Sequence, residues 1–362
     1  HLRAATGLNS PMSDLAQELG TEMSVRSALI GPRRIAKELK DREIKDDDAD
    51  ELAEAVMRLF QTGKAPTKAA GKKSQKGNAE DEADDDEAEE KAGRQILTLG
   101  EKEISALTSV AAALHAAKAA PSQMRELVEK PTKRKNQPKP IQDALAALDA
   151  MRSHAGLDGA LFGRMATGIA LSRVDSAVHV GHALTTHAIQ SSVDFFSAQD
   201  QLLEREVGET GGAHIGSREL TAGVFYLPVV IDVEQIRRNF AGWTNTEIAK
   251  VVGWLVKTVA TVTPAAMLGS TAPFPDPGEV VVEVTNGQPV NAMGAFEKPV
   301  AATLEASVAA FNAHMQRVWA MIGHPPKVMR LSEYVDPKAT QPAVQRLADT
   351  VAAAISEVHA QS

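Results

Sequence analysis

The segment from Lys64 to Arg94 constrains the fold of this chain more than any other feature, because it cannot belong to a hydrophobic core. It consists mainly of Ala, Gly, Lys, Ser, Asp and Glu. Such a segment buries too little apolar surface to offset the entropy lost on ordering. We therefore predict a disordered insertion. Its basic first half and acidic second half can pair transiently, but a solvated linker is the simpler interpretation.

The net charge of the chain is concentrated in this insertion. The formal charge is −8, and residues 80–90 hold nine carboxylates, so −8 minus −9 leaves about +1 for the remainder. The overall acidity therefore does not exclude a nucleic-acid partner.

Length and residue usage narrow the class of protein further. The 362 residues can bury one large core or two smaller ones. The absence of cysteine excludes a disulfide scaffold and a thiolate site, and it suits a reducing cytoplasm. Apolar stretches such as Val110–Ala120 are interrupted by His115 and Lys118, so none has membrane-spanning length. We expect a soluble, cytoplasmic protein with no membrane partner.

The residues on both sides of the insertion have helical periodicity. Gly63 supplies a C-terminal stop before it, and Thr98 and Glu101 have the spacing of a capping box after it. The first 150 residues are therefore predicted to be mostly α-helical, with a further helix at Ile141–Met151. The apolar positions that carry the periodicity are Leu52, Val56, Leu59 and Phe60, then Ile104, Leu107, Val110 and Leu114.

From about Val174 the sequence becomes rich in β-branched and aromatic residues. Thr244 and Glu247 form a second capping-box pattern ahead of an amphipathic helix. The order strand, strand, helix, strand indicates an α+β fold with helices on one side of a sheet. The predicted strands are Val178–Ile189, Gly223–Val233 and Gly278–Thr285, and the predicted helices are Thr244–Val262, Thr303–Met321 and Pro342–Val358.

Histidine and glycine clusters in this half do not make an enzyme site. On a continuous strand His179 and His187 share one face and His182 points the other way, which disfavours a three-histidine metal site. The glycines of 208–216 lack the Lys-Ser/Thr of a phosphate loop, and a flexible hairpin tip is the better interpretation. No strong hydrolase motif is present. We predict no catalytic residue, metal or cofactor.

Several segments of the second half resemble a known family. Met165 lies in the run GRM of one segment, and Ile215 lies in the run AHIG of another. Together these segments resemble the CasC backbone subunit of type I-E CRISPR Cascade, a member of the RAMP superfamily. They are LFGRMATG (Leu161–Gly168), VDSAVHVGHALTTHAIQSSVDFFSAQDQL (Val174–Leu202), GGAHIGSRELTAGVFY (Gly211–Tyr226) and NAMGAFEKPV (Asn291–Val300).

The resemblance covers most of Leu161–Asp336, and its best segment in the helical part is LTLGEKEI (Leu97–Ile104). Family members begin with a strand and a phosphate-binding segment, which would precede His1. The family fold implies a ferredoxin-like or RNA-recognition-like palm, helical fingers and a thumb β-hairpin. The implied parts are a remnant of the first palm helix (1–14), fingers (15–150, insertion 64–94), palm (151–336), thumb within it (191–222) and a C-terminal helix (337–362).

The resemblance also implies a mechanism, in which copies stack along a CRISPR guide RNA and each thumb displaces one nucleotide at regular intervals. An apolar wedge between bases costs a few kcal/mol of unstacking. Met165 and Ile215 suit that role, although core packing is the ordinary alternative. By residue-wise match, the implied RNA-binding residues are Arg164 at a phosphate and Met165, Phe196, Ser197, His214 and Ile215 at the displaced nucleotide.

A basic loop before Ile141 resembles, more loosely, a finger segment that attracts duplex DNA. Its residues are Lys130, Lys133, Arg134 and Lys135, and a solvated loop is the alternative. The implied partners are guide RNA, target DNA, other copies of the chain and the large, small and guide-end capping subunits of Cascade. Two other functions stay open: an RNA-processing or target-cleaving endoribonuclease of the same superfamily, and an assembly protein that never touches RNA.

Overall fold

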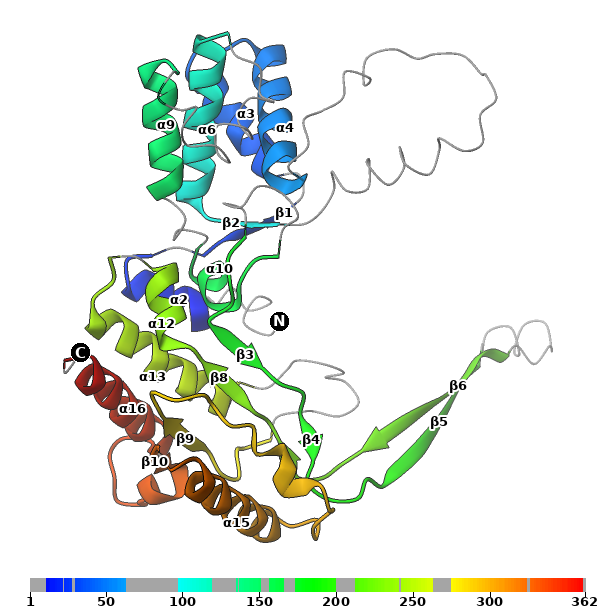
Figure 1. Cartoon of the computed structure of the whole chain (residues 1–362). Coiled ribbons are helices and arrows are strands. Elements are labelled where there is room, and N and C mark those ends of the chain that lie inside the picture. Colours follow the sequence, from blue (N-terminus) through cyan, green and yellow to red (C-terminus); the bar gives the residue numbers. More distant parts are fainter. Residues whose placement is uncertain are drawn as a thin grey trace. The chain divides into compact units, whose positions relative to one another are not determined.

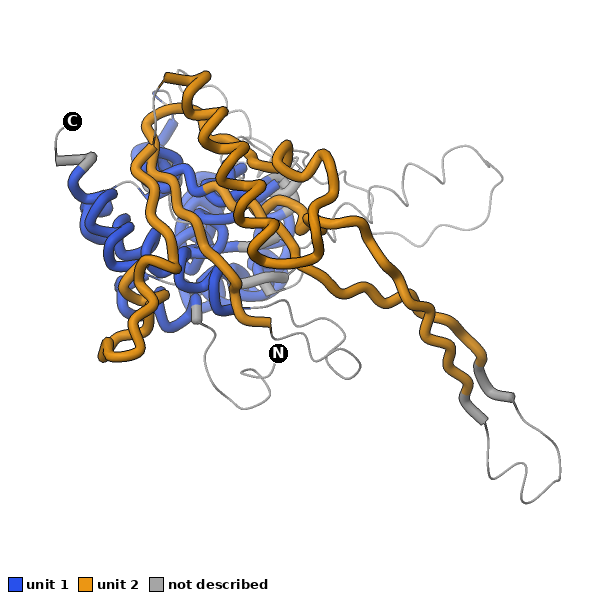
Figure 2. Tube along the Cα trace, turned by 90° about the horizontal axis from the view of Figure 1, so that it is seen from below, with its two compact units in different colours: residues 1–179, 231–274, 348–362 blue, residues 180–230, 275–347 orange. Residues whose placement is uncertain are grey.

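The computed structural model of the chain describes two compact units. Unit 1 comprises residues 1–179, 231–274 and 348–362, and unit 2 comprises residues 180–230 and 275–347 (Figure 2). The predicted insertion lies outside the described residues. Those described are 11–21, 23–27, 30–62, 97–118, 135, 137–150, 156–165, 173–199, 212–240, 242–262, 275–323 and 326–360.

The fold is mixed α+β, mostly helical with small antiparallel sheets (Figure 1). The helices are α2 (Pro11–Glu18), α3 (Ile30–Asp41), α4 (Asp46–Thr62), α6 (Glu101–Ala116), α9 (Lys139–Ala150), α10 (Gly156–Phe162), α12 (Val233–Asn239), α13 (Asn245–Thr261), α15 (Leu304–Ile322) and α16 (Ala343–Ala360), with the 3-10 helices η3 (Ala292–Phe296) and η4 (Leu331–Tyr334). The strands are β1 (Val25–Ser27), β2 (Leu97–Leu99), β3 (Val178–Val180), β4 (Leu184–Thr185), β5 (Ser191–Gln199), β6 (Gly212–Thr221), β7 (Phe225–Tyr226), β8 (Val229–Ile231), β9 (Val281–Val284) and β10 (Lys327–Arg330). The predicted α+β class is confirmed at this level.

Within unit 1, the helices α3, α4, α6 and α9 pack around one apolar core (Figure 1). Periodicity located this core correctly wherever side chains are described, since each such position is buried. A fully buried aliphatic or aromatic side chain contributes about 1.5–3 kcal/mol. The buried positions are Leu52, Val56, Phe60, Ile104, Leu107, Val110 and Leu114, joined by Ile35, Leu39, Ile141 and Leu145.

One predicted helix cap is wrong and another is confirmed. Thr98 lies in β2, opposite Arg26 of β1, and α6 begins after Gly100. The carboxylate of Glu103 accepts the Gly100 N–H at 3.0 Å instead. At α13 the capping box is present as predicted, because Thr244 donates its N–H to Glu247 at 2.7 Å and accepts the Glu247 N–H at 3.3 Å.

The strand predicted at Val178–Ile189 is broken into two short strands. β3 pairs with β8 and β4 pairs with β7, and between them the Gly181 N–H donates to the Pro228 carbonyl at 2.9 Å. The side-chain alternation assumed for His179, His182 and His187 therefore does not hold. The other predicted strands are also shorter than expected, since Gly223–Val233 contains β7 and β8.

The longest strands of unit 2 form the hairpin β5–β6. Figures 1 and 2 both show it extending away from the rest of that unit. Its strands pair antiparallel from Ser191 opposite Thr221 to Ala198 opposite His214. No helix in the described part of the chain is long and apolar enough to cross a membrane.

Candidate nucleic-acid interface

One face of the β5–β6 hairpin carries exposed apolar side chains. The pairing sets Phe195 opposite Ser217 and Ser197 opposite Ile215. Alternate residues of a strand share a face, so Val193, Phe195, Ser197 and Ile215 lie on the same side. Val193, Phe195 and Ile215 are 72%, 68% and 67% exposed. This row, Val193, Phe195 and Ile215, is called the apolar row below.

The opposite face of the hairpin holds Phe196. Its ring lies over Gly216 of the facing strand, and the Arg218 guanidinium carbon is 6.0 Å from the ring centroid. Phe196 is 39% exposed, so less of its surface is accessible than in the residues of the apolar row. The two predicted residues Ser197 and Ile215 therefore lie together, and Phe196 lies on the other face. The side chain of His214 is outside the described part of the structure.

Phe195 is a candidate contact residue that the sequence did not lead us to predict. It follows Val193 by two positions and precedes Ser197 by two, so strict alternation could have found it. The sequence alone did not reveal which of Phe195 and Phe196 shares a face with Ile215, because that depends on the pairing register.

The His187 ring joins the two chain segments at the base of the hairpin, and the His187 backbone bridges to Val300 in the rest of unit 2. The Val224 N–H donates to His187 Nε2 at 3.2 Å, and Nδ1 lies 2.9 Å from the Ala188 carbonyl. Since a backbone N–H can only donate, Nε2 accepts, and the ring proton sits on Nδ1. Thr186 adds a hydroxyl contact of 2.8 Å to Ser307 of α15. His187 is thus buried in a structural role, whereas His179 and His182 are exposed.

A second anchor lies just beyond the hairpin, at Tyr226 of β7. Its hydroxyl donates to Asn291 Oδ1 at 3.3 Å and accepts the Ala292 N–H at 3.0 Å. Burial raises the pKa of Tyr226 above its usual value. The tyrosine therefore stays a neutral donor that holds β7 against η3.

Met165 stands at the end of a tightly held segment of unit 1. α10 ends at Phe162, and the φ of +78° at the next residue, Gly163, is favourable only for glycine. The next residue, Arg164, exchanges two backbone hydrogen bonds with Val174, at 2.8 and 3.1 Å. Met165 follows and is 87% exposed. An exposed methionine on a fixed backbone is available for contact with a partner.

Arg164 itself points inward. Its Nη1 and Nη2 each donate to an oxygen of Glu103 at 2.7 Å, and its guanidinium lies 5.3 Å from the centroid of the Phe60 ring. The side chains of Arg164 and Glu103 are 2% and 6% exposed. This geometry does not support the prediction that Arg164 contacts a phosphate.

The remaining predicted site residues are placed only in part. Lys135 is exposed, whereas Lys130, Lys133 and Arg134 lie outside the described residues. Within the described residues, no group of three histidine, aspartate or glutamate side chains is placed to hold a metal ion.

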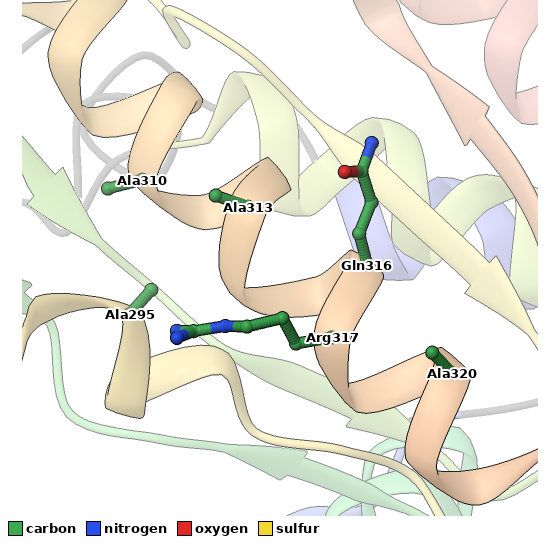
Figure 3. Close-up of a pocket in the computed structure, with 6 residues that line it drawn as sticks. All are labelled: Ala295, Ala310, Ala313, Gln316, Arg317 and Ala320. Atoms are coloured by element: carbon green, nitrogen blue, oxygen red, sulfur yellow. The ribbon is translucent and has the colours of Figure 1, made fainter.

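A shallow groove of about 640 Å³ runs along α15 in unit 2. In Figure 3, Arg317 extends from α15 toward Ala295 of η3. The other lining residues are Ala310, Ala313, Gln316 and Ala320. These six residues offer no nucleophile, carboxylate or imidazole, so the groove lacks groups for acid–base or covalent catalysis.

A family profile described as "CT1975-like protein" matches residues 9–359. The match covers nearly the whole chain, both units and the hairpin included. The chain belongs to the CT1975-like family of Cas proteins. No curated protein matches this CT1975-like protein significantly.

This CT1975-like protein shares its fold with a chain of a solved structure. One chain, from a structure described as "CRISPR RNA-guided surveillance complex, pre-nicking", is 21% identical, and the match covers 95% of this chain and 88% of that one with a TM-score of 0.60. A second, from a "CRISPR RNA-guided surveillance complex", is 24% identical over 53% of this chain and 76% of that one, with a TM-score of 0.43. The first likeness shows that the two chains share a fold. The TM-score of the second is too low to support an argument.

Proposed function

We propose that this CT1975-like protein is the non-catalytic backbone subunit of a type I-E-like Cascade, which binds a CRISPR guide RNA in many copies and presents it to target DNA. The observation that carries the proposal is the projecting β5–β6 hairpin with its apolar row. Family membership and the fold shared with a chain of an RNA-guided complex support it.

The hairpin needs a partner for physical reasons. A two-stranded hairpin without other packing is marginally stable in water. Phe195, Val193 and Ile215 are each about two-thirds exposed, and exposed apolar patches usually mark interaction sites. Nucleotide bases offer flat apolar faces that stack on aromatic side chains whatever the sequence. The apolar row is therefore suited to a guide RNA of any sequence.

The resemblance implies fingers and a thumb, and elements of the two units supply candidates for them. In this proposal the α3–α4–α6–α9 cluster belongs to the fingers, and β5–β6 is the thumb. The apolar row and Met165 contact the guide where a nucleotide is displaced. Other copies of the chain and the remaining Cascade subunits cover the surfaces that the guide leaves free.

Purification of the assembled complex tests the proposal. We expect co-purifying RNA, seen as a raised ratio of absorbance at 260 and 280 nm, and nuclease protection at a regular repeat. Cleavage of bound target RNA would favour the endoribonuclease instead. A complex that assembles without RNA would favour the assembly protein.

The basic loop predicts a specific effect on target search. Replacing Lys133, Arg134 and Lys135 with Ala is expected to weaken duplex-DNA association and to flatten its salt dependence, because fewer counterions are released. Guide retention should hardly change. DNA affinity is measured by titration across a range of salt concentrations.

A matched control removes the same charge elsewhere on the fingers. Arg33, Lys37 and Lys102 are exposed on α3 and α6, so their triple Ala variant also loses three cations. It is expected to weaken DNA association less than the loop variant. Equal losses in both variants would mean that only net charge matters, and the loop would revert to a solvated surface.

Deleting Ala65–Lys91 is expected to leave the melting temperature and guide binding nearly unchanged. The reason is compositional, since this segment cannot contribute to a core. Thermal unfolding followed by circular dichroism checks the prediction. A large drop in melting temperature would show that the segment stabilises the helical cluster.

A further inference from the structure

We propose that Glu103 and Arg164 form a positioning pair, which fixes Met165 for contact with RNA, and that Arg164 itself does not bind the guide. This inference rests on the proposed function, because it concerns how one contact of the RNA interface is held.

The charge of Arg164 is fully engaged inside the protein. Both terminal nitrogens donate to the two Glu103 oxygens at 2.7 Å, which is the bidentate geometry of the strongest arginine–carboxylate pairs. With 2% of the Arg164 side chain exposed, a phosphate could reach the guanidinium only if the pair opened. Glu103 also accepts the Gly100 N–H, so its carboxylate is held by the start of α6.

The backbone around Arg164 also fixes the position of the next residue, Met165. Two hydrogen bonds to Val174 hold residue 164 in an extended bridge, and successive residues in such a bridge point to opposite sides. Arg164 points inward to Glu103, and Met165 therefore points outward. Gly163 allows the chain to enter this bridge directly from α10, because a Cβ there would lie 2.9 Å from the Val174 carbonyl oxygen and the Ser176 nitrogen.

Fixing the position of Met165 matters for binding. A side chain that wedges between bases must be ordered in the complex, and ordering it only on binding reduces affinity. The ion pair and the two hydrogen bonds to Val174 hold the backbone that carries Met165 before RNA binds, which reduces this cost. Three elements contribute: Phe60 comes from α4, Glu103 from α6, and Arg164 follows α10. The pair thus connects the helical cluster to the RNA contact within unit 1.

Glu103→Gln separates the two roles of Arg164 because they predict opposite results. Gln keeps the size of the side chain but weakens its hold on the guanidinium. If Arg164 were a phosphate contact, freeing it would strengthen guide binding and steepen its salt dependence. We expect instead an unchanged salt slope and a loss of regularly exposed guide bases, measured by chemical probing on the assembled complex.

Two further variants complete the test. Glu103→Leu with Arg164→Met replaces a buried ion pair by apolar side chains, a change that proteins often tolerate without loss of stability. We expect its salt slope to equal that of the wild type, and a fall of about 0.7 per subunit would overturn the inference. Met165→Ala added to Glu103→Gln should produce no further loss of exposed bases, since both act on one contact. Additive losses would show that the pair is only structural.

The outcome for the wild type separates this inference from the proposed function. A wild-type complex without RNA, or with RNA but no periodic base exposure, would overturn both. A wild-type complex with the periodic pattern, combined with a reduced slope in the apolar pair variant, would overturn the positioning role alone.

Discussion

Replacing Gly223 with Ala is expected to displace the base of the β5–β6 hairpin and to lower the melting temperature by several degrees. A Cβ at this position would lie 2.1 Å from His187 Nε2, the atom that accepts the Val224 N–H. The ring must move, and the hydrogen bond is lost. Overpacking of this kind typically costs about 1–3 kcal/mol, which shifts the melting temperature of a domain of this size by roughly 2–8 °C per kcal/mol. Thermal unfolding measures the change.

Two variants control for the identity of the contact. Gly287→Ala makes the same chemical change in unit 2, but its Cβ would meet only Thr285 Oγ1, at an ordinary 3.4 Å. It should have almost no effect. In a His187→Ala background, Gly223→Ala should cost much less than in the wild type, because the ring that it displaces is gone. An equal cost in both backgrounds would place the clash elsewhere.

How much of the fold could be predicted depended on how far apart the interacting residues lie in the sequence. Thr244 and Glu247 are three residues apart, and their capping box is present as predicted. Thr98 looked equivalent, but it is held in β2 by pairing with β1, far upstream in the sequence. Likewise, the break between β3 and β4 depends on separate partners, β8 and β7. Local spacing cannot reveal such pairings.

In the candidate site, too, features that depend on residues distant in the sequence were not predicted. Met165 and Ile215 were selected through the family resemblance, and both are exposed. The environment of Arg164 was not predictable, because Glu103 lies 61 positions earlier. An arginine beside an exposed methionine suggests a surface charge until its partner is known. Phe195 was missed for a related reason, since only the register against β6 shows that Phe195, and not Phe196, shares a face with Ile215.

Truncating Met165 and the apolar row is expected to remove the periodic distortion of the guide while leaving most of its affinity. The variants are Met165→Ala, and Phe195→Ala with Ile215→Ala. Phosphate contacts supply most of the affinity for nucleic acid, whereas each stacking contact contributes about 1–3 kcal/mol. Without the wedges, the guide recovers its stacking energy by straightening. The reactivity of the displaced bases should then fall to that of their neighbours, as measured by chemical probing of the assembled complex.

Met321→Ala is the matched control, because Met321 is 78% exposed at the end of α15 and belongs to no predicted contact. It should leave both affinity and base exposure unchanged. Phe196→Ala tests the face assignment: Phe196 lies opposite the apolar row, so its loss should disturb the pattern less than that of Phe195. If the Met165 and hairpin variants together left the regular pattern of exposed bases intact, these side chains would not be wedges. The distortion would then have to come from other residues of the interface.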